Sequence, residues 1–189
     1  VRGIRITAEG GQSLWREMGM SASCVRLQAR ILRAGSHAVD VDSQLEDLNR
    51  VNADVLPITD PRYPPLLRTI HDPPPVLYLR GDAAHLSGAQ LAMVGSRSAS
   101  PAGLRAASML AGEFCRAGLH ITSGLARGID GAAHQGALLA KGKSIAVMAT
   151  GIDQVYPLRH RKLADELVQA GCLVSEFPPG VPPLRHNFP

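Results

Sequence analysis

The chain has 189 residues, of which 45% are hydrophobic and 19% charged, enough for one core of ordinary domain size and a small appended unit. No apolar run reaches the roughly 18 residues that suggest a membrane span, and Val1-Arg2-Gly3-Ile4-Arg5 lacks the apolar region of a secretion signal. The three cysteines, Cys24, Cys115 and Cys172, are widely spaced. This spacing argues against a metal site or a disulfide framework and favours a reducing, cytoplasmic location.

Positive charge is concentrated in the second part of the chain. Nine arginines and nine carboxylates occur between Val1 and Pro75, whereas eleven lysines and arginines and seven carboxylates occur from Val76 to Pro189. The whole net charge of +4 therefore lies in the second part. Such a distribution is expected of a domain that meets phosphates.

The pattern divides the chain into three regions. Residues 1–55 are predicted to form a small helical N-terminal module. Residues 56–80 are rich in proline, which removes backbone donors, so they are predicted to form a connector and an edge strand. Residues 81–189 are predicted to form the main domain.

Strand and helix patterns alternate from Val76 onward. Strands are predicted at 76–79, 89–94, 119–122, 144–148 and 172–175, with 89–94 buried. Helices are predicted from a Ser100 cap to Gly118, at about 127–140 and at about 159–170. This alternation predicts an α/β fold with a doubly wound, mostly parallel sheet, covered on both faces.

Three loops follow predicted strands and carry glycine with polar or basic residues. They are Gly95-Ser96-Arg97-Ser98, Ser123-Gly124-Leu125-Ala126-Arg127-Gly128-Ile129-Asp130 and Thr150-Gly151-Ile152-Asp153. The carboxyl ends of parallel strands meet at one edge, where ligands bind. Arginine beside a helix start forms an anion cradle. Neither G-x-G-x-x-G nor a P-loop occurs, so NAD and ATP are disfavoured and no cofactor is expected.

Other residues allow a chemical and a structural interpretation. Asp130 and His134 share a helix face at i, i+4, which suits an acid/base or metal pair, or a structural hydrogen bond between them. Glu176 suits a general base, or a structural hydrogen bond to a neighbouring loop. The structural interpretation is preferred in each case, so no catalytic residue and no metal ligand is assigned.

Aromatic and basic residues near the expected strand ends suggest contacts with a nucleic-acid strand. Tyr156, Phe177 and Phe188 could stack on bases or pack within the fold. The run Arg159-His160-Arg161-Lys162 could follow a strand of phosphates or form a solvated helix face.

Several motifs, taken together, resemble those of the DprA/Smf family from about Asp60 to Pro189. They are Val94–Arg97, Ser123–Asp130 followed by Ala133-His134, Gly151–Asp153 with Tyr156-Pro157, Ser175–Pro178 with Pro183 and Phe188-Pro189, and, upstream, Asp60–Leu67 and Asp72–Leu79. The chain differs from the family pattern at Ala149, where glycine is usual, and at His160, where asparagine is usual. The resemblance also implies an Arg-Asn-Arg run beyond Pro189.

The resemblance implies an extended Rossmann-like domain that binds single-stranded DNA, dimerises and transfers the strand to the recombinase RecA in natural transformation. The residues expected to contact DNA are Gly95, Ser96, Arg97, Ser123, Gly124, Arg127, Gly128, Gly151, Arg159 and Arg161. Two alternatives remain: a phosphoribohydrolase-type nucleotide-processing enzyme, whose P-G-G-x-G-T-x-x-E motif this sequence lacks, and a module for a small phosphorylated ligand.

Overall fold

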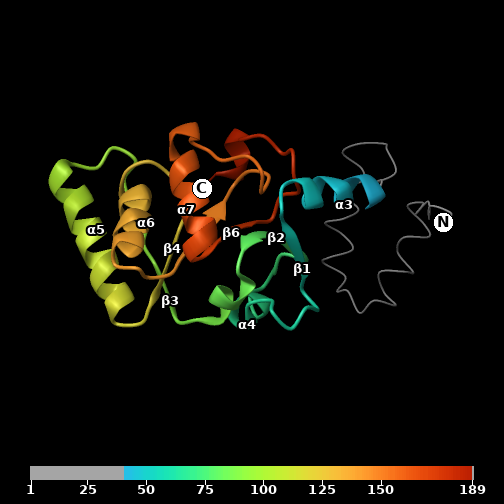
Figure 1. Cartoon of the computed structure of the whole chain (residues 1–189), viewed down its shortest axis with the longest axis horizontal. Coiled ribbons are helices and arrows are strands. Elements are labelled where there is room, and N and C mark those ends of the chain that lie inside the picture. The colour runs from blue at the N-terminus through green and yellow to red at the C-terminus, as the bar shows by residue number, and fades with distance from the viewer. Residues whose placement is uncertain (1–40, 189) are drawn as a thin grey trace.

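The computed structural model describes residues 41–188, and for residues 41–45 it describes the backbone alone (Figure 1). Most of the predicted N-terminal module therefore lies outside the described residues. The helices are α3 (Val41–Arg50), α4 (Pro65–Arg68), α5 (Pro101–Arg116), α6 (Ile129–Leu139) and α7 (Arg161–Ala170), with short 3₁₀ helices at Ala83–Ser87, Leu158–His160 and Arg185–Asn187. The strands are β1 (Asp54–Pro57), β2 (Val76–Gly81), β3 (Gln90–Ala92), β4 (His120–Ser123), β5 (Ser144–Met148) and β6 (Cys172–Ser175).

The strands form one six-stranded sheet in the order β1-β2-β6-β5-β4-β3. Strands β3, β4, β5 and β6 pair in parallel, whereas β2 is antiparallel to both β1 and β6. The predicted α/β class with a mostly parallel sheet is confirmed. The stretch predicted as connector and edge strand supplies β2 and the end of β1, which forms one edge of the sheet.

Strand β3 differs from the prediction of a buried strand over 89–94. It is only three residues long, and Gln90 and Ala92 are exposed. The reason is its place at the other edge of the sheet, where β4 is its single partner among the described strands. An apolar run of this length does not tell an edge strand from a central one.

Helix α5 begins where the sequence predicts. The Ser100 hydroxyl oxygen accepts a hydrogen bond from the Gly103 amide at 3.2 Å, and Pro101 occupies the first helical position. Helix α6 begins at Ile129, two residues later than predicted, because Gly128 has a φ of +79°, outside the helical region.

Helices α5, α6 and α7 lie on one face of the sheet, with α5 at the left of Figure 1. On this face Ile121 packs with small residues of α5 and α6, and Leu173 packs with leucines of α7. Ile145 points the opposite way and packs with the buried Tyr63, whose hydroxyl donates to the Pro74 carbonyl at 2.7 Å.

That second face is covered only in part. Residues from the segments 58–75 and 82–88 cover β1, β2 and β6, but Val94 and Val147 remain 72% and 46% exposed. Within residues 41–188, α5, α6 and α7 cover one face, whereas the helical cover of the second face is limited to α4, through Leu67, and the 3₁₀ helix Ala83–Ser87. We call the uncovered part, with Ala92, Val94, Thr122 and Val147, the open sheet face. None of the described helices combines the length and apolarity that crossing a bilayer requires.

Candidate nucleic-acid interface

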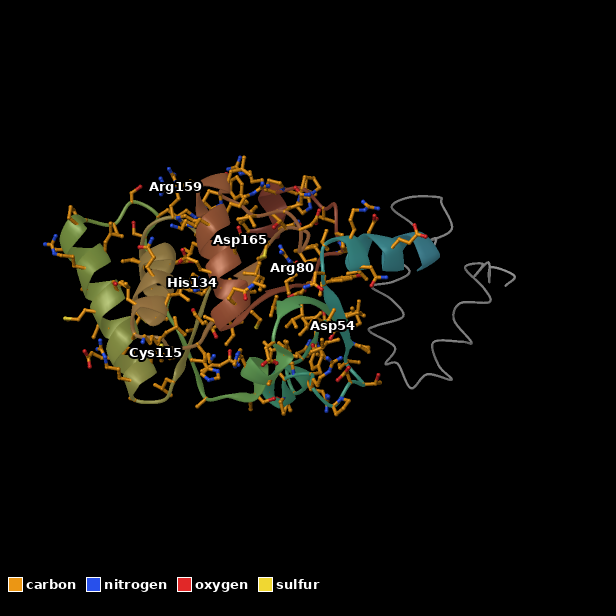
Figure 2. All side chains as sticks on the ribbon, viewed as in Figure 1. Asp54, Arg80, Cys115, His134, Arg159 and Asp165 are labelled. Carbon is orange, nitrogen blue, oxygen red and sulfur yellow. The ribbon has the colours of Figure 1, made fainter. Side chains whose placement is uncertain are left out.

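The carboxyl ends of four parallel strands border a pocket of about 850 Å³. The loop after each strand contributes a different kind of side chain. Arg97 follows β3, Arg127 follows β4, Tyr156 follows β5 and Glu176 follows β6. Figure 2 shows Arg159, which also follows β5, and Cys115, which precedes β4, at opposite ends of this part of the molecule.

Three exposed arginines give the pocket a positive rim. Arg97, Arg127 and Arg159 all line the pocket. None of them forms an ion pair or a hydrogen bond through its side chain with another residue between 41 and 188. Their guanidinium groups are therefore available to an anion, and guanidinium suits bidentate contact with phosphate.

The first two loops are packed directly against each other. The Ile129 amide donates to the Ser96 carbonyl at 3.2 Å, and a Cβ atom at Gly128 would collide with that same carbonyl oxygen. A Cβ atom at Gly95 would lie 2.8 Å from the Ile129 side chain. Gly95, Ser96 and Gly128 are thus not among the lining residues, and their contacts hold the loop of Arg97 against the loop of Arg127.

Two further residues predicted to contact DNA lie outside the pocket lining. The Gly151 amide donates to the Val181 carbonyl at 2.8 Å, and a Cβ atom at Gly151 would lie 2.6 Å from the Pro178 carbonyl oxygen. The absence of a side chain at Gly151 therefore lets the loop after β5 pack closely against the segment after β6. Arg161 is exposed at the first position of α7.

The pocket floor contains residues of the second loop. Ser123 and Gly124 both line the pocket, as predicted residues of the site. The buried Asp130 carboxylate accepts a hydrogen bond from the Gly124 amide at 3.1 Å. The Ser123 hydroxyl donates to the Met93 carbonyl at 2.6 Å. Asp130 thus fixes the turn after β4.

The Asp130–His134 hydrogen bond suggested by the sequence is not formed. Instead, Nδ1 of His134 lies 2.7 Å from Oγ of Ser144, whose hydroxyl donates to the Ile121 carbonyl at 3.0 Å. Since the serine proton is used there, Nδ1 of His134 is the donor. Burial lowers the pKa of His134 to about 3, so the ring is neutral at physiological pH. No group of three metal-ligating side chains occurs within the described residues.

The three aromatic residues predicted for base stacking all line the pocket. The rings of Tyr156 and Phe188 have centroids 5.6 Å apart and are tilted by 58°. Tyr156 is 51% exposed, so much of its surface remains accessible. Phe177 lies at the end of β6, and its amide donates to the Ser175 hydroxyl oxygen at 2.9 Å.

Glu176 contributes an unpaired carboxylate to the pocket wall. Among the described residues, none donates a hydrogen bond to it or pairs with it, so the structural hydrogen bond suggested by the sequence is not found. Burial raises the pKa of the Glu176 carboxyl, and the nearby Asp72 carboxylate raises it further.

Sequence reasoning missed part of the pocket. The open sheet face lines it, as do His186 and Asn187 near the C-terminal end of the described chain. Thr122 and Val147 belong to strands that are otherwise largely buried. No sequence signal could have identified them, because their exposure depends on which segments cover the sheet.

The chain matches a family of known proteins over most of its described length. The model of the family described as DNA recombination-mediator protein A matches residues 54–189. Protein Smf of Escherichia coli is 45% identical over 150 residues, which are 79% of this chain and 40% of that protein. The DNA processing protein DprA of Bacillus subtilis is 41% identical over 135 residues, which are 71% of this chain and 46% of that protein. The chain thus spans less than half the length of either relative.

Two solved structures share the fold. The X-ray structure of DprA from Streptococcus pneumoniae superposes with a TM-score of 0.67 at 37% identity, covering 71% of this chain and 47% of that one. A structure of DprA from Helicobacter pylori, described as giving insight into its binding of single-stranded DNA, has a TM-score of 0.65 at 28% identity. It covers 72% of this chain and 60% of that one.

Proposed function

Because the chain belongs to the DNA recombination-mediator protein A family, which includes DprA and Smf proteins, we propose that it binds single-stranded DNA and is not an enzyme. One observation carries the proposal: three arginines that form no ion pair with any residue of the described chain, 41–188, border one pocket together with three aromatic side chains. Cations that hold phosphates and rings that stack on bases are the two parts of a sequence-tolerant single-strand site.

In this proposal Arg97 and Arg127 bind the phosphates. They follow neighbouring strands, and the contact between Gly128 and Ser96 fixes the spacing of their loops. Arg159 extends the positive rim. Gly95, Ser96 and Gly128 act by holding the two loops together, whereas Ser123 and Gly124 form the floor beneath the phosphate.

In this proposal the bound DNA strand leaves the pocket over the start of α7. Arg161 is exposed there, where it can meet a phosphate further along the strand. Gly151 serves the site indirectly, because it lets the segment after β6 lie close to the loop after β5. Tyr156, Phe177 and Phe188 offer faces to the bases.

The family also suggests a wider role. The description of the family as a recombination mediator supports the proposal that the protein transfers its strand to RecA in the bacterial cytoplasm during natural transformation, as a homodimer. The chain spans only part of its relatives, so this role belongs to the whole protein. Sedimentation of the whole protein at tens of micromolar tests self-association, and a purely monomeric protein would contradict it.

The decisive experiment compares arginine variants. Arg97→Ala and Arg127→Ala should each weaken binding to oligo-dT by about 1.5–3 kcal/mol, the range for hydrogen bonds to charged groups. Their melting temperatures should match the wild type, because both side chains are exposed. Arg105→Ala is the matched control, an exposed arginine of α5 that lies outside the pocket lining. Unchanged affinity in both pocket variants would overturn the proposal.

A second assay separates a binding protein from an enzyme. The carboxylates of Asp130 and Glu176 in the pocket wall are the observation that favours a nucleotide-processing enzyme. The wild-type protein should nevertheless leave AMP, ATP and single-stranded DNA intact. Release of free base or phosphate that Asp130→Asn or Glu176→Gln abolishes would instead establish an enzyme.

A further inference from the structure

The charge of the side chains that line the pocket changes from one side of the sheet to the other. Its strands run in the order β3, β4, β5, β6, and the loops that follow them bring Arg97, Arg127, Tyr156 and Glu176, respectively, to the pocket lining. Neighbouring strands lie about 4.8 Å apart, so the end of β6 is about 10 Å from the end of β4. The loops after the four strands thus form a row, with two cations from the loops at one end and a carboxylate from the loop at the other.

The carboxylate end of this row repels phosphate. Glu176 has no cationic partner among residues 41–188, and the carboxylate of Asp72 lies near enough to disfavour its ionisation. On this side of the pocket the lining includes the apolar side chains of Phe177 and of Val147, which belongs to the neighbouring strand β5. This end suits a group that is flat, uncharged and rich in N–H donors.

A nucleotide has its phosphate and its base edge at opposite ends, in the same order. We propose that one nucleotide of a bound strand lies along this row, with its phosphate at Arg97 and Arg127, its base beside Tyr156, and the Watson–Crick edge of the base at Glu176, which selects guanine over thymine. The inference rests on the proposed function and adds a base preference to it.

The selectivity follows from the donors on each base. Guanine presents two neighbouring N–H groups, at N1 and N2, to the two acceptor oxygens of a carboxylate. Thymine presents one N–H between two carbonyl oxygens, whose lone pairs face the carboxylate. Adenine and cytosine each offer a single amino group. Guanine is therefore the best partner for Glu176, and thymine the poorest.

The test uses competition between short oligonucleotides. The pentanucleotides d(TTGTT), d(TTITT) and d(TTTTT) displace a labelled oligo-dT from the wild-type chain, and a single guanine cannot form a quadruplex. A good bidentate base contact discriminates between two bases by about 5- to 150-fold. Only one of the five bases that can occupy the site is guanine, so the advantage is averaged with four unchanged thymines. The oligonucleotide d(TTGTT) should therefore compete roughly two- to thirtyfold better than d(TTTTT). The hypoxanthine pentamer, which lacks the N2 amino group, should fall between them.

The variants identify the residue responsible. Glu176→Gln keeps the size of the side chain but replaces one acceptor with a donor, so the guanine preference should disappear while the melting temperature stays unchanged. Glu166→Gln is the matched control, an exposed glutamate on α7 that lies outside the pocket, and it should keep the preference.

Each failure has a distinct meaning. Equal competition by the guanine and thymine pentamers on the wild type, or a preference that persists in Glu176→Gln, overturns the inference and leaves the proposed function standing. A wild-type chain that does not bind oligo-dT at all overturns both. A guanine preference lost equally in Glu166→Gln would show a general charge effect and would also overturn the role of Glu176.

Discussion

The guanidinium carbon of Arg97 lies over the ring of Phe188, 5.9 Å from its centroid. The contact joins the loop after β3 to the C-terminal end of the described chain. Tyr156 contacts the same ring from the loop after β5. Phe188, a residue of the pocket lining, is thus in contact with both a cation and an aromatic ring, and a base stacked on it in the proposed complex would lie near all three side chains.

Phe188→Leu should weaken binding to oligo-dT, because leucine retains apolar bulk but has no aromatic face. The expected loss is about 1–3 kcal/mol, the range for one base–aromatic stack. Phe188→Tyr keeps the face and should bind like the wild type. Fluorescence anisotropy with a labelled oligonucleotide gives both affinities. Wild-type affinity in Phe188→Leu would mean that Phe188 serves packing alone.

The salt dependence of binding reports the number of phosphates neutralised. Each contact with a single strand contributes about −0.7 to the slope of log K against log salt concentration. If Arg97, Arg127 and Arg159 each neutralise one phosphate, the wild-type slope should be about −2 or steeper. Arg159→Ala should make it shallower by about 0.7, and the control Arg105→Ala should leave it unchanged. A flat response of the wild type would contradict phosphate binding.

The packing of the first two loops makes a prediction about stability. Gly128 and Gly118 both have positive φ, +79° and +88°, where an L side chain costs roughly 1–2 kcal/mol. A Cβ atom at Gly118 meets nothing within 4 Å, whereas one at Gly128 collides with the Ser96 carbonyl. Gly128→Ala should therefore lower the free energy of unfolding clearly more than Gly118→Ala, and it alone should also weaken binding to oligo-dT. Equal destabilisation in urea melts would contradict the close contact.

Much of this architecture could be predicted from local signals. The cap at Ser100 with Pro101, the apolar runs of β5 and β6, and the glycine-arginine loops all act within a few residues of the chain. Because parallel strands place their carboxyl ends together, these local signals also placed Arg97 and Arg127 at one site, and the family resemblance was confirmed.

What the sequence could not supply depends on long-range packing. The exposure of Val94 and Val147 depends on whether a segment covers that face. The partner of His134 is Ser144, ten residues away on β5, and helical spacing pointed instead to Asp130. Gly151 was predicted to contact phosphate because it follows a strand, and its amide also bonds to Val181, in a segment that sequence patterns do not place.

The buried His134 should make the fold sensitive to acid. Its pKa is about 3 in the folded chain and about 6.5 in an unfolded one, so below about pH 6.5 the unfolded state binds the additional proton and stability falls as the pH drops toward 3. Between pH 6.5 and 5 the loss from this group should be about 2 kcal/mol. His134→Asn removes the titrating ring but supplies a side-chain amide that can still donate to Ser144. This variant should therefore show a shallower pH dependence of stability in urea melts, whatever its absolute stability. His71→Asn, at an exposed histidine, should keep the wild-type slope. Identical slopes in all three proteins would mean that His134 becomes charged within the fold.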